Sequence, residues 1–182
     1  MGTLNFSGLD EDNIVTFNST GGGKAGLAKL VTERGQAAQS VRAQFQARRS
    51  IWLAKLSALF EVIEYRWLED LVDSGQVEIT HETTKLSEEY IGEYEAPEIM
   101  IRIANSIVRL EPRGTLIVGA AGRVDMTGPN GTLLLLLDST TDDMSIPFEK
   151  RQFEWSIVSR VPQVVRSILD EDSFSDGLSS LI

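Results

Sequence analysis

Three carboxylates are the residues whose types and positions best fit a chemical role. Asp125 lies in an alternating segment ahead of a glycine-rich turn, Asp138 ends the apolar run after that turn, and Glu89 lies upstream in an acidic stretch. If the strands that carry them are neighbours, their oxygens gather at one end of a sheet. Carboxylates gathered in this way hold divalent cations for hydrolysis. Glu89, Asp125 and Asp138 are therefore candidate catalytic residues of a metal-dependent nuclease-like enzyme or another hydrolase.

The pattern lacks one part that nuclease chemistry needs. Nucleases of the restriction-endonuclease type place a lysine two residues after the second carboxylate, where it stabilises charge at the phosphate. That position is Thr140 in this chain. The competing interpretation of Asp125 is an ion pair with Arg109 or Arg123 on an exposed sheet face, worth ~0–1 kcal/mol. Hydrolysis is thus an alternative hypothesis, and we expect a protein without catalytic residues.

A glycine-rich stretch at residues 19–25 includes Lys24 and invites comparison with a phosphate-binding loop. Asn18 stands where that loop has its first glycine, and Ala25 stands where a serine or threonine holds magnesium. We therefore expect a flexible linker, with no nucleotide and no other cofactor. The sequence leaves open whether residues 21–24 hold an anion.

Metal ligands other than carboxylates are scarce. The chain has no cysteine and one histidine, His81, which alternates in phase with Val77 and Ile79. This phase predicts a strand in which His81 points inward and makes a hydrogen bond. Without a second histidine or a thiolate, no metal site is expected.

The elements that must position these residues begin with a long helical region at residues 24–74. Apolar residues recur there three or four apart, which is the period of one helix face. Gly35 is the weak point, because glycine costs about 1 kcal/mol in a helix interior, and a break is possible there. Gly75 suits the position just past a helix end. The apolar series consists of Leu27, Val31, Ala38, Val41, Phe45, Trp52, Leu56, Phe60, Ile63, Trp67 and Leu71.

After Gly75 the apolar period changes to two, which predicts strands. Short alternating runs separated by turns predict an antiparallel β-meander of about five to six strands in residues 75–182, with a short C-terminal helix capped by Asp172 or Ser173. Runs are expected at residues 77–81, 99–103, 108–110, 115–118, 123–127, 132–138 and 153–158, whereas residues 86–97 read as a surface connection. The predicted fold is α+β, with the long helix packed on the sheet and a flexible segment at residues 1–23. We expect burial of Trp52, Phe60, Trp67, Leu135, Leu137 and Trp155.

Charge and composition indicate where in the cell the protein is expected. The net charge of −10 is uneven: residues 24–60 carry seven basic residues and one acidic, whereas residues 61–98 carry twelve acidic and two basic. No stretch of 18 uncharged apolar residues predicts a membrane span, and the N-terminus has no basic and apolar signal pattern. With the absence of cysteine, these features favour a soluble cytoplasmic protein of bacterial type.

The leading hypothesis is a non-catalytic protein-interaction or assembly module that associates through the long helix. Its apolar stripe extends over ~55 Å for 37 residues, whereas a seven-residue strand spans only ~23 Å. The partner is a second copy of the chain or another protein, with basic groups meeting acidic ones such as Glu61, Glu64 and Glu69. A second alternative is nucleic-acid binding by the basic helix half, which lacks interleaved aromatic residues outside the apolar face. The expected contact residues are Val41, Phe45, Trp52, Arg42, Arg48 and Arg49.

Overall fold

The computed structural model describes residues 23–141, 143, 145–159 and 164–182. The chain divides into two compact units, residues 1–40 and residues 41–182. In the first unit the described residues, 23–40, are all helical. Most of the segment predicted to be flexible, and most of the glycine-rich stretch, lie outside the described residues.

Helix α1 (Gly23–Val62) passes through Gly35 without interruption, so the possible break there is absent. One glycine costs only about 1 kcal/mol, which the favourable helix formers that follow it offset. The irregularity comes later, in the π-helical turn η2 (Ile63–Trp67), where the Leu68 amide donates to the Ile63 carbonyl at 2.9 Å. A last short helix, α2 (Glu69–Asp73), ends before Gly75, whose φ of +73° fits the predicted stop.

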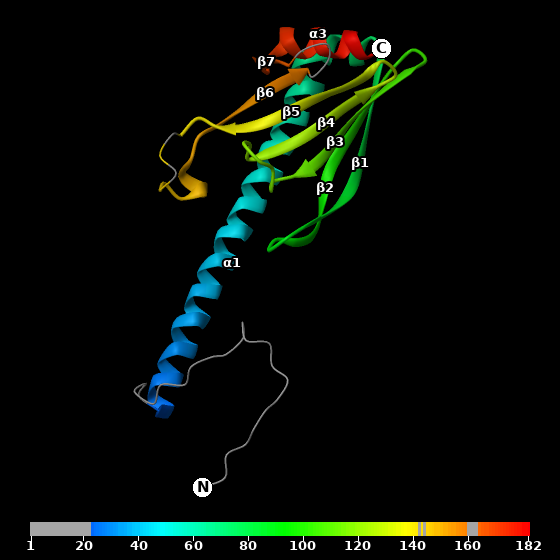
Figure 1. Ribbon diagram of the computed structural model, residues 1–182. Coiled ribbons are helices and arrows are strands. Elements are labelled where there is room, and N and C mark those ends of the chain that lie inside the picture. Colours follow the sequence, from blue (N-terminus) through cyan, green and yellow to red (C-terminus); the bar gives the residue numbers. More distant parts are fainter. Residues whose placement is uncertain (1–22, 142, 144, 160–163) are drawn as a thin grey trace, which may run out of the picture. The chain divides into compact units, whose positions relative to one another are not determined.

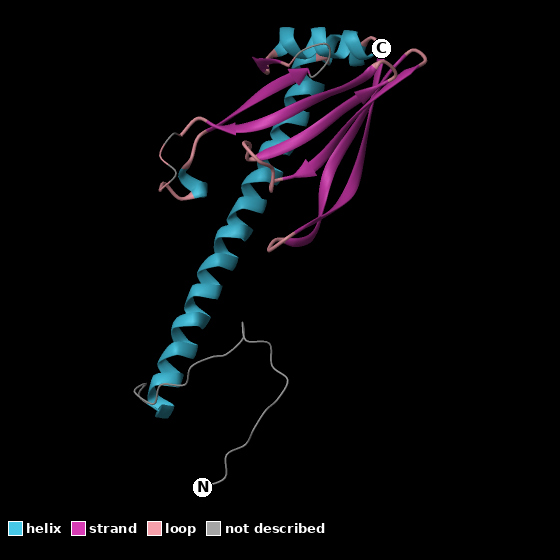
Figure 2. Cartoon of the chain, viewed as in Figure 1, coloured by secondary structure: helices cyan, strands magenta, loops and turns pink. Residues whose placement is uncertain are grey.

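The sheet has seven strands that follow one another in chain order, and each pairs antiparallel with the next (Figures 1 and 2). This confirms the predicted α+β fold, with a long helix, an antiparallel meander and a short C-terminal helix; the strand number is slightly above the predicted range. The strands are β1 (Val77–Glu88), β2 (Gly92–Ile103), β3 (Ser106–Gly114), β4 (Gly122–Gly128), β5 (Gly131–Ser139), β6 (Phe153–Ser159) and β7 (Val165–Ile168).

Three local predictions were wrong. Residues 86–97, expected as a surface connection, form the outer half of the β1–β2 hairpin, which turns through Tyr90 and Gly92, both at positive φ. Residues 115–118, expected as a strand, form a turn with an isolated bridge between Ile117 and Ala120. Strand β7 was not predicted, because all four of its residues are exposed and carry no burial pattern.

One face of the sheet carries the core. Register pairs join Ile99 to Leu110 and Leu110 to Met126, and a neighbouring row joins Val124 to Leu135 and Leu135 to Ile157. Residues 41–62 of α1 and helix α3 (Glu171–Leu181) cover this face (Figure 1). One aromatic contact joins α1 to the sheet, because the ring centroids of Trp52 and Trp155 are 5.9 Å apart, and another joins η2 to α3, because those of Trp67 and Phe174 are 5.3 Å apart.

The predicted core is largely confirmed. Trp52, Phe60, Leu135 and Leu137 are buried, and Trp67 and Trp155 are partly buried against the same core. The cap of α3 is Asp170, two residues ahead of the expected Asp172, because its carboxylate accepts from the Ser173 amide while the Ser173 hydroxyl accepts from the Asp170 amide. No helix among the described residues is long and apolar enough to cross a membrane.

Candidate functional site

The expected contact residues of α1 divide into exposed and occupied ones. Val41 and Arg42 are exposed. Phe45 stacks on Tyr90 at the tip of the β1–β2 hairpin, with ring centroids 5.3 Å apart. Trp52 is fully buried. The assignment of Trp52 to a contact surface is therefore corrected: its ring belongs to the core, as its helical phase also predicted.

The two adjacent arginines also touch the chain itself. The Arg49 guanidinium lies 5.9 Å from the ring centre of Tyr94. Arg48 donates from Nη2 to the Thr115 carbonyl, and its guanidinium carbon lies 4.8 Å from the ring centre of Phe148. Burial lowers the pKa of Arg48, Arg151 lowers it further, and Glu88 opposes the shift. Arg48 thus anchors the loop after β3, a role that the sequence did not reveal.

Glu88 is the centre of a polar cluster that sequence reasoning missed. Its Oε2 accepts from the amides of Thr115 and Leu116, each at 2.7 Å, and from the Thr115 hydroxyl at 3.0 Å. Its Oε1 accepts from the Tyr94 hydroxyl. Burial raises the pKa of Tyr94 well above its usual range, and Glu88 raises it further. In the sequence, Glu88 looks like one member of an acidic surface run, and no local signal distinguishes it.

The structure does not bring the three candidate carboxylates together. Asp125 is opposite Leu134 in the β4–β5 pair, and Asp138 lies four residues farther along β5, which corresponds to ~13 Å. Glu89 is exposed in the β1–β2 turn. Among the described residues, no group of three histidine, aspartate or glutamate side chains is placed to hold a metal ion. A shared metal site built from Glu89, Asp125 and Asp138 is therefore not formed.

Both aspartates are engaged in ion pairs instead. Asp125 receives Arg123 Nε at 2.6 Å and Arg113 Nε at 2.9 Å. Asp138 pairs with Arg166 and accepts from the Ser156 hydroxyl at 2.7 Å. The ion-pair interpretation of Asp125 is correct for Arg123.

The remaining predicted partners lie elsewhere. Arg109 forms an ion pair with Glu98 instead of Asp125, with Arg109 Nη1 3.0 Å from Glu98 Oε1. His81 is half exposed, and its Nε2 lies 2.7 Å from Glu64 of η2. The predicted hydrogen bond of His81 is present, but its side chain is not enclosed in the core. Glu64, proposed as an acidic contact for a partner, is therefore occupied by the chain's own histidine.

A cavity of about 490 Å³ lies at the end of β5, beside Arg48. We call it the Arg48 pocket. Two of its polar atoms have no hydrogen-bond partner, namely Arg48 Nε and Asp138 Oδ1. The side chains that define it are Arg48, Asp138, Ser139, Thr141, Phe148 and Arg151.

A second cavity, of about 250 Å³, is lined by the C-terminal end of α1, by Trp67, by Trp155 of β6 and by Leu169. Its lining is mostly apolar and includes Ala58, Val62, Trp67, Trp155 and Leu169, with one cation at Lys55. We call it the tryptophan groove. The segment that includes Val62 and Trp67 of this lining is acidic: residues 61–73 contain five carboxylates and one arginine.

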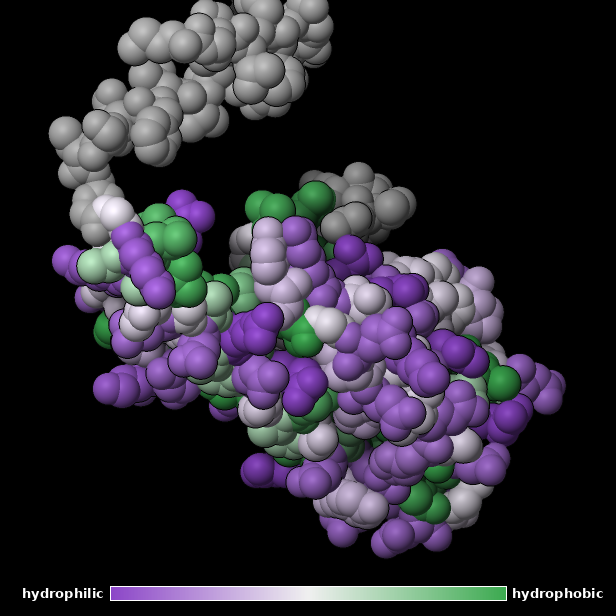
Figure 3. Space-filling model, turned by 90° about the horizontal axis from the view of Figure 1, so that it is seen from below, coloured by the Kyte–Doolittle hydropathy of each residue, from purple (hydrophilic) through white to green (hydrophobic). Residues whose placement is uncertain are grey.

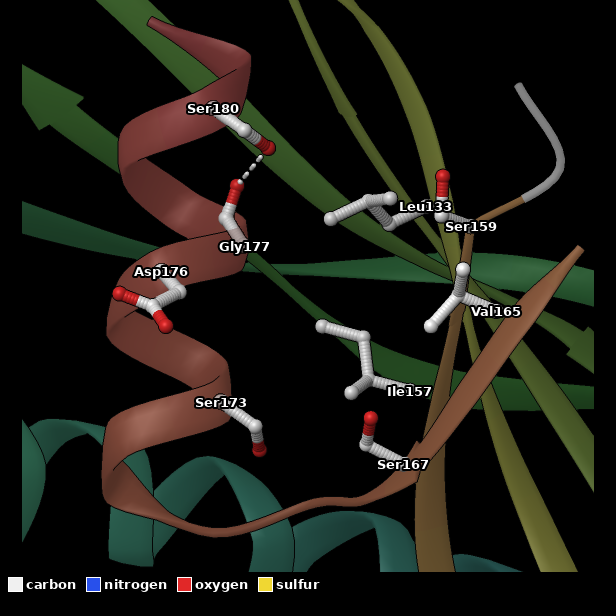
Figure 4. Close-up of a pocket in the computed structure, with 9 residues that line it drawn as sticks. All are labelled: Leu133, Ile157, Ser159, Val165, Ser167, Ser173, Asp176, Gly177 and Ser180. Atoms are coloured by element: carbon white, nitrogen blue, oxygen red, sulfur yellow. Dashed lines mark hydrogen bonds between the residues drawn. The ribbon is translucent and has the colours of Figure 1, made fainter. Parts of the chain in front are cut away.

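A third cavity, of about 280 Å³, lies between α3 and the strands β5 to β7. Figure 4 shows Leu133, Ile157 and Val165 directed toward α3, with serine hydroxyls around them. The Ser180 hydroxyl donates to the Gly177 carbonyl at 2.7 Å, so it is satisfied within the helix. This site offers hydroxyls and one exposed carboxylate, Asp176.

The first part of α1 carries exposed apolar residues. Every residue from 27 to 44 is exposed. The exposed fractions are 61% for Leu27, 46% for Leu30, 62% for Val31 and 46% for Val41. Figure 3 shows apolar side chains interspersed with polar ones where the described helix begins, whereas the visible surface of the sheet unit is mainly hydrophilic.

Comparison of the chain with models of protein families, with curated proteins and with solved structures finds no match.

Proposed function

We propose that this protein is a non-catalytic association module in which residues 23–44 of α1 dock on a second copy of the chain. The observation that carries the proposal is the exposure of every residue from 27 to 44, including four large apolar side chains. A helical segment with no tertiary packing is marginally stable in water, because most helix stability in proteins comes from burial of one face. A partner that covers this face supplies the missing burial.

The exposed apolar residues have the spacing of a docking helix. Leu27, Leu30 and Val31 lie at positions i, i+3 and i+4, and Val41 lies ten residues after Val31, so all fall within about one side of the helix. Helices dock into apolar grooves through anchors with this spacing. The sheet unit of a second copy offers such a groove, which contains Trp67 and Trp155.

Charge complementarity favours a second copy. Residues 23–44 contain four basic residues and one acidic, a balance of +3, whereas residues 61–73 contain five acidic and one basic, a balance of −4. Opposite charges set orientation and speed association in helix pairs. An antiparallel arrangement would place Lys24, Lys29 and Arg34 of one copy near the exposed Glu61 and Glu69 of the other. Two basic segments laid on each other would instead repel.

The proposal is tested by the mass of the native assembly. The double variant Leu27→Asp and Val31→Asp should convert a dimer or higher oligomer to monomer, with little change in the tryptophan fluorescence, because all three tryptophans lie within residues 41–182. Sedimentation velocity at several concentrations, together with native mass spectrometry, measures this. Raising the salt concentration should also weaken the assembly, because exposed charges are screened beyond ~8–10 Å at physiological ionic strength.

Val118→Asp is the matched control, because Val118 is a fully exposed apolar residue in the loop between β3 and β4. It adds one negative charge and removes one exposed apolar side chain without touching α1 or the tryptophan groove. Its assembly mass should equal that of the unmodified protein. An unmodified protein that is monomeric at every accessible concentration would contradict self-association, and so would an assembly that both helix substitutions leave intact.

A further inference from the structure

The Arg48 pocket combines positive charge, an aromatic wall and a carboxylate. The guanidinium carbons of Arg48 and Arg151 lie 4.8 and 5.9 Å from the ring centre of Phe148, so two cations share one aromatic side chain. Burial lowers the pKa of Arg48, the charge of Glu88 opposes this shift, and Arg151, a neighbouring like charge, adds a smaller lowering. Arg151 Nε donates to the Ile146 carbonyl at 2.9 Å, so Arg48 is the candidate cation for receiving an anion.

Arg48 retains hydrogen-bonding capacity in this position. Its Nη2 is used on the Thr115 carbonyl, whereas Nε has no partner and is shielded from solvent. The nearby Glu88 carboxylate does not pair with it, because its oxygens accept from Thr115, Leu116 and Tyr94. A buried donor without an acceptor costs free energy, and an oxyanion reached by a small rotation of the side chain removes that cost.

Asp138 is the carboxylate in the same lining. Its Oδ2 is occupied by Arg166 and Ser156, whereas Oδ1 has no partner. The ion pair with Arg166 offsets its charge, so Asp138 does not repel an anion at Arg48 as strongly as a free carboxylate would. The empty acceptor position suits an ammonium or another N–H donor.

We propose that the Arg48 pocket binds a small zwitterionic molecule, with its carboxylate or phosphate on Arg48 and its ammonium group on Asp138. The volume of about 490 Å³ is within the range of small-molecule sites. Phe148 provides an apolar wall against which the carbon chain of the ligand packs. The hydroxyls of Ser139 and Thr141 lie in the same lining and add polar contacts along the ligand.

The test is a titration of the full chain labelled with nitrogen-15, followed through the Nε–Hε signal of Arg48. Four probes are compared at constant ionic strength: β-alanine and O-phosphoethanolamine, which are zwitterions, and acetate and inorganic phosphate, which carry the oxyanion alone. We expect saturable shifts, with each zwitterion binding about tenfold more tightly than its matching simple anion, since a charge-assisted hydrogen bond contributes on this scale. The zwitterion that binds more tightly shows whether the pocket prefers a carboxylate or a phosphate.

Two variants and one control separate the roles of the side chains. Arg48→Lys keeps the charge but removes the Nε–Hε group, so its titration is followed through the backbone amide signals of Ser139 and Thr141, and it should weaken both zwitterions about tenfold or more. Asp138→Asn should reduce the affinity for each zwitterion to that for its simple anion. Arg49→Lys is the control, because Arg49 is adjacent in sequence but lies over Tyr94 and outside the pocket; its affinities should equal those of the unmodified protein.

The titration of the unmodified protein is sufficient to refute the proposal. The test therefore remains decisive even if a variant fails to fold. Absence of a saturable Arg48 shift with all four probes up to about 10 mM would exclude the site, because binding weaker than this is non-specific. Equal affinity for β-alanine and acetate, and for O-phosphoethanolamine and phosphate, would refute the assignment of the ammonium group to Asp138.

Discussion

Gly122 leaves open the space that the ring of Trp52 occupies. A methyl group placed on Gly122 would lie 2.2 Å from Cζ3 and 2.4 Å from Cε3 of Trp52, well inside contact distance. Gly122 begins β4 opposite Leu137, and Trp52 is fully buried on α1. The close approach of helix and sheet at this point therefore depends on the missing side chain. Any larger residue at 122 must displace a ring that surrounding core residues hold in place.

The substitution Gly122→Ala should destabilise the sheet unit by about 1–3 kcal/mol, because overpacking a dense core forces side chains or backbone to move. Urea denaturation followed by tryptophan fluorescence measures the loss. Gly35→Ala is the matched control, since no atom lies within 4 Å of the added methyl group and Gly35 is inside a helix. It should leave the midpoint unchanged or raise helix content, as alanine is favoured over glycine by about 1 kcal/mol. Equal midpoints for Gly122→Ala and the unmodified protein would show that Trp52 has room to move.

Glu88 should be far more important for stability than its neighbour Glu89. Replacing Glu88 by alanine leaves the amides of Thr115 and Leu116 without their acceptor and removes the partner of the Tyr94 hydroxyl. Unsatisfied partly buried donors cost about 1–3 kcal/mol each, so we expect a total loss of about 2–4 kcal/mol. Glu89→Ala removes an exposed carboxylate one residue away and should change the free energy of unfolding by less than about 0.5 kcal/mol. Thermal and urea unfolding compare the two; similar losses would contradict the assigned role of Glu88.

The helix and most strands were predictable because the spacing of apolar residues in the sequence matches the buried face of each element. Leu56, Phe60 and Ile63 lie on one helix face, and the leucines of β5 lie in a covered strand; each pattern is local and survives folding unchanged. Gly75 ended the helical region as expected because its φ is positive. Local chemistry therefore determined the element order and the fold class.

The outer half of the β1–β2 hairpin was missed because its composition resembles an exposed loop. Tyr94 and Ala96 are nevertheless buried, and Phe45 of α1 covers Tyr90. Pro97 argued against a strand, but β2 pairs with β3 only from Ile99 onward, so this proline lies where β2 has one neighbour. A proline is tolerated there because its missing N–H is not needed by a second strand. Contacts between distant segments, rather than local preference, decide this part of the fold.

The candidate carboxylate site failed for a reason that sequence does not contain. Asp125 and Asp138 lie on paired strands, but the register places Asp125 in mid-strand and Asp138 near the end. Their separation follows from which residues face each other across the hairpin. Two of their arginine partners, Arg113 and Arg166, come from other strands. The Arg48 pocket is likewise assembled from residues that lie far apart in the sequence, from Arg48 to Arg151. Only the tertiary arrangement makes such sites visible.

Glu98 should give the stability of the protein a measurable pH dependence. Its side chain is almost fully buried, and burial raises its pKa; Arg109 opposes this shift, and Glu111 and Glu82 add to it. The folded state therefore holds this proton to higher pH than the unfolded state, whose glutamate pKa is about 4.3. Between the two pKa values the folded state binds more protons, so the contribution of Glu98 to stability falls as the pH rises. The penalty is absent below the unfolded pKa and complete above the folded one.

The variant Glu98→Gln mimics the protonated side chain and should remove this component of the pH dependence. Relative to the unmodified protein it should gain stability as the pH rises from about 4 to about 8, because only the unmodified protein pays the cost of burying the charge. Urea denaturation at several pH values measures the difference in unfolding free energy. Glu93→Gln, an exposed position on the same strand, is the control and should show no such trend. A constant difference between Glu98→Gln and the unmodified protein across this range would mean that the Arg109 ion pair fully compensates the burial of Glu98.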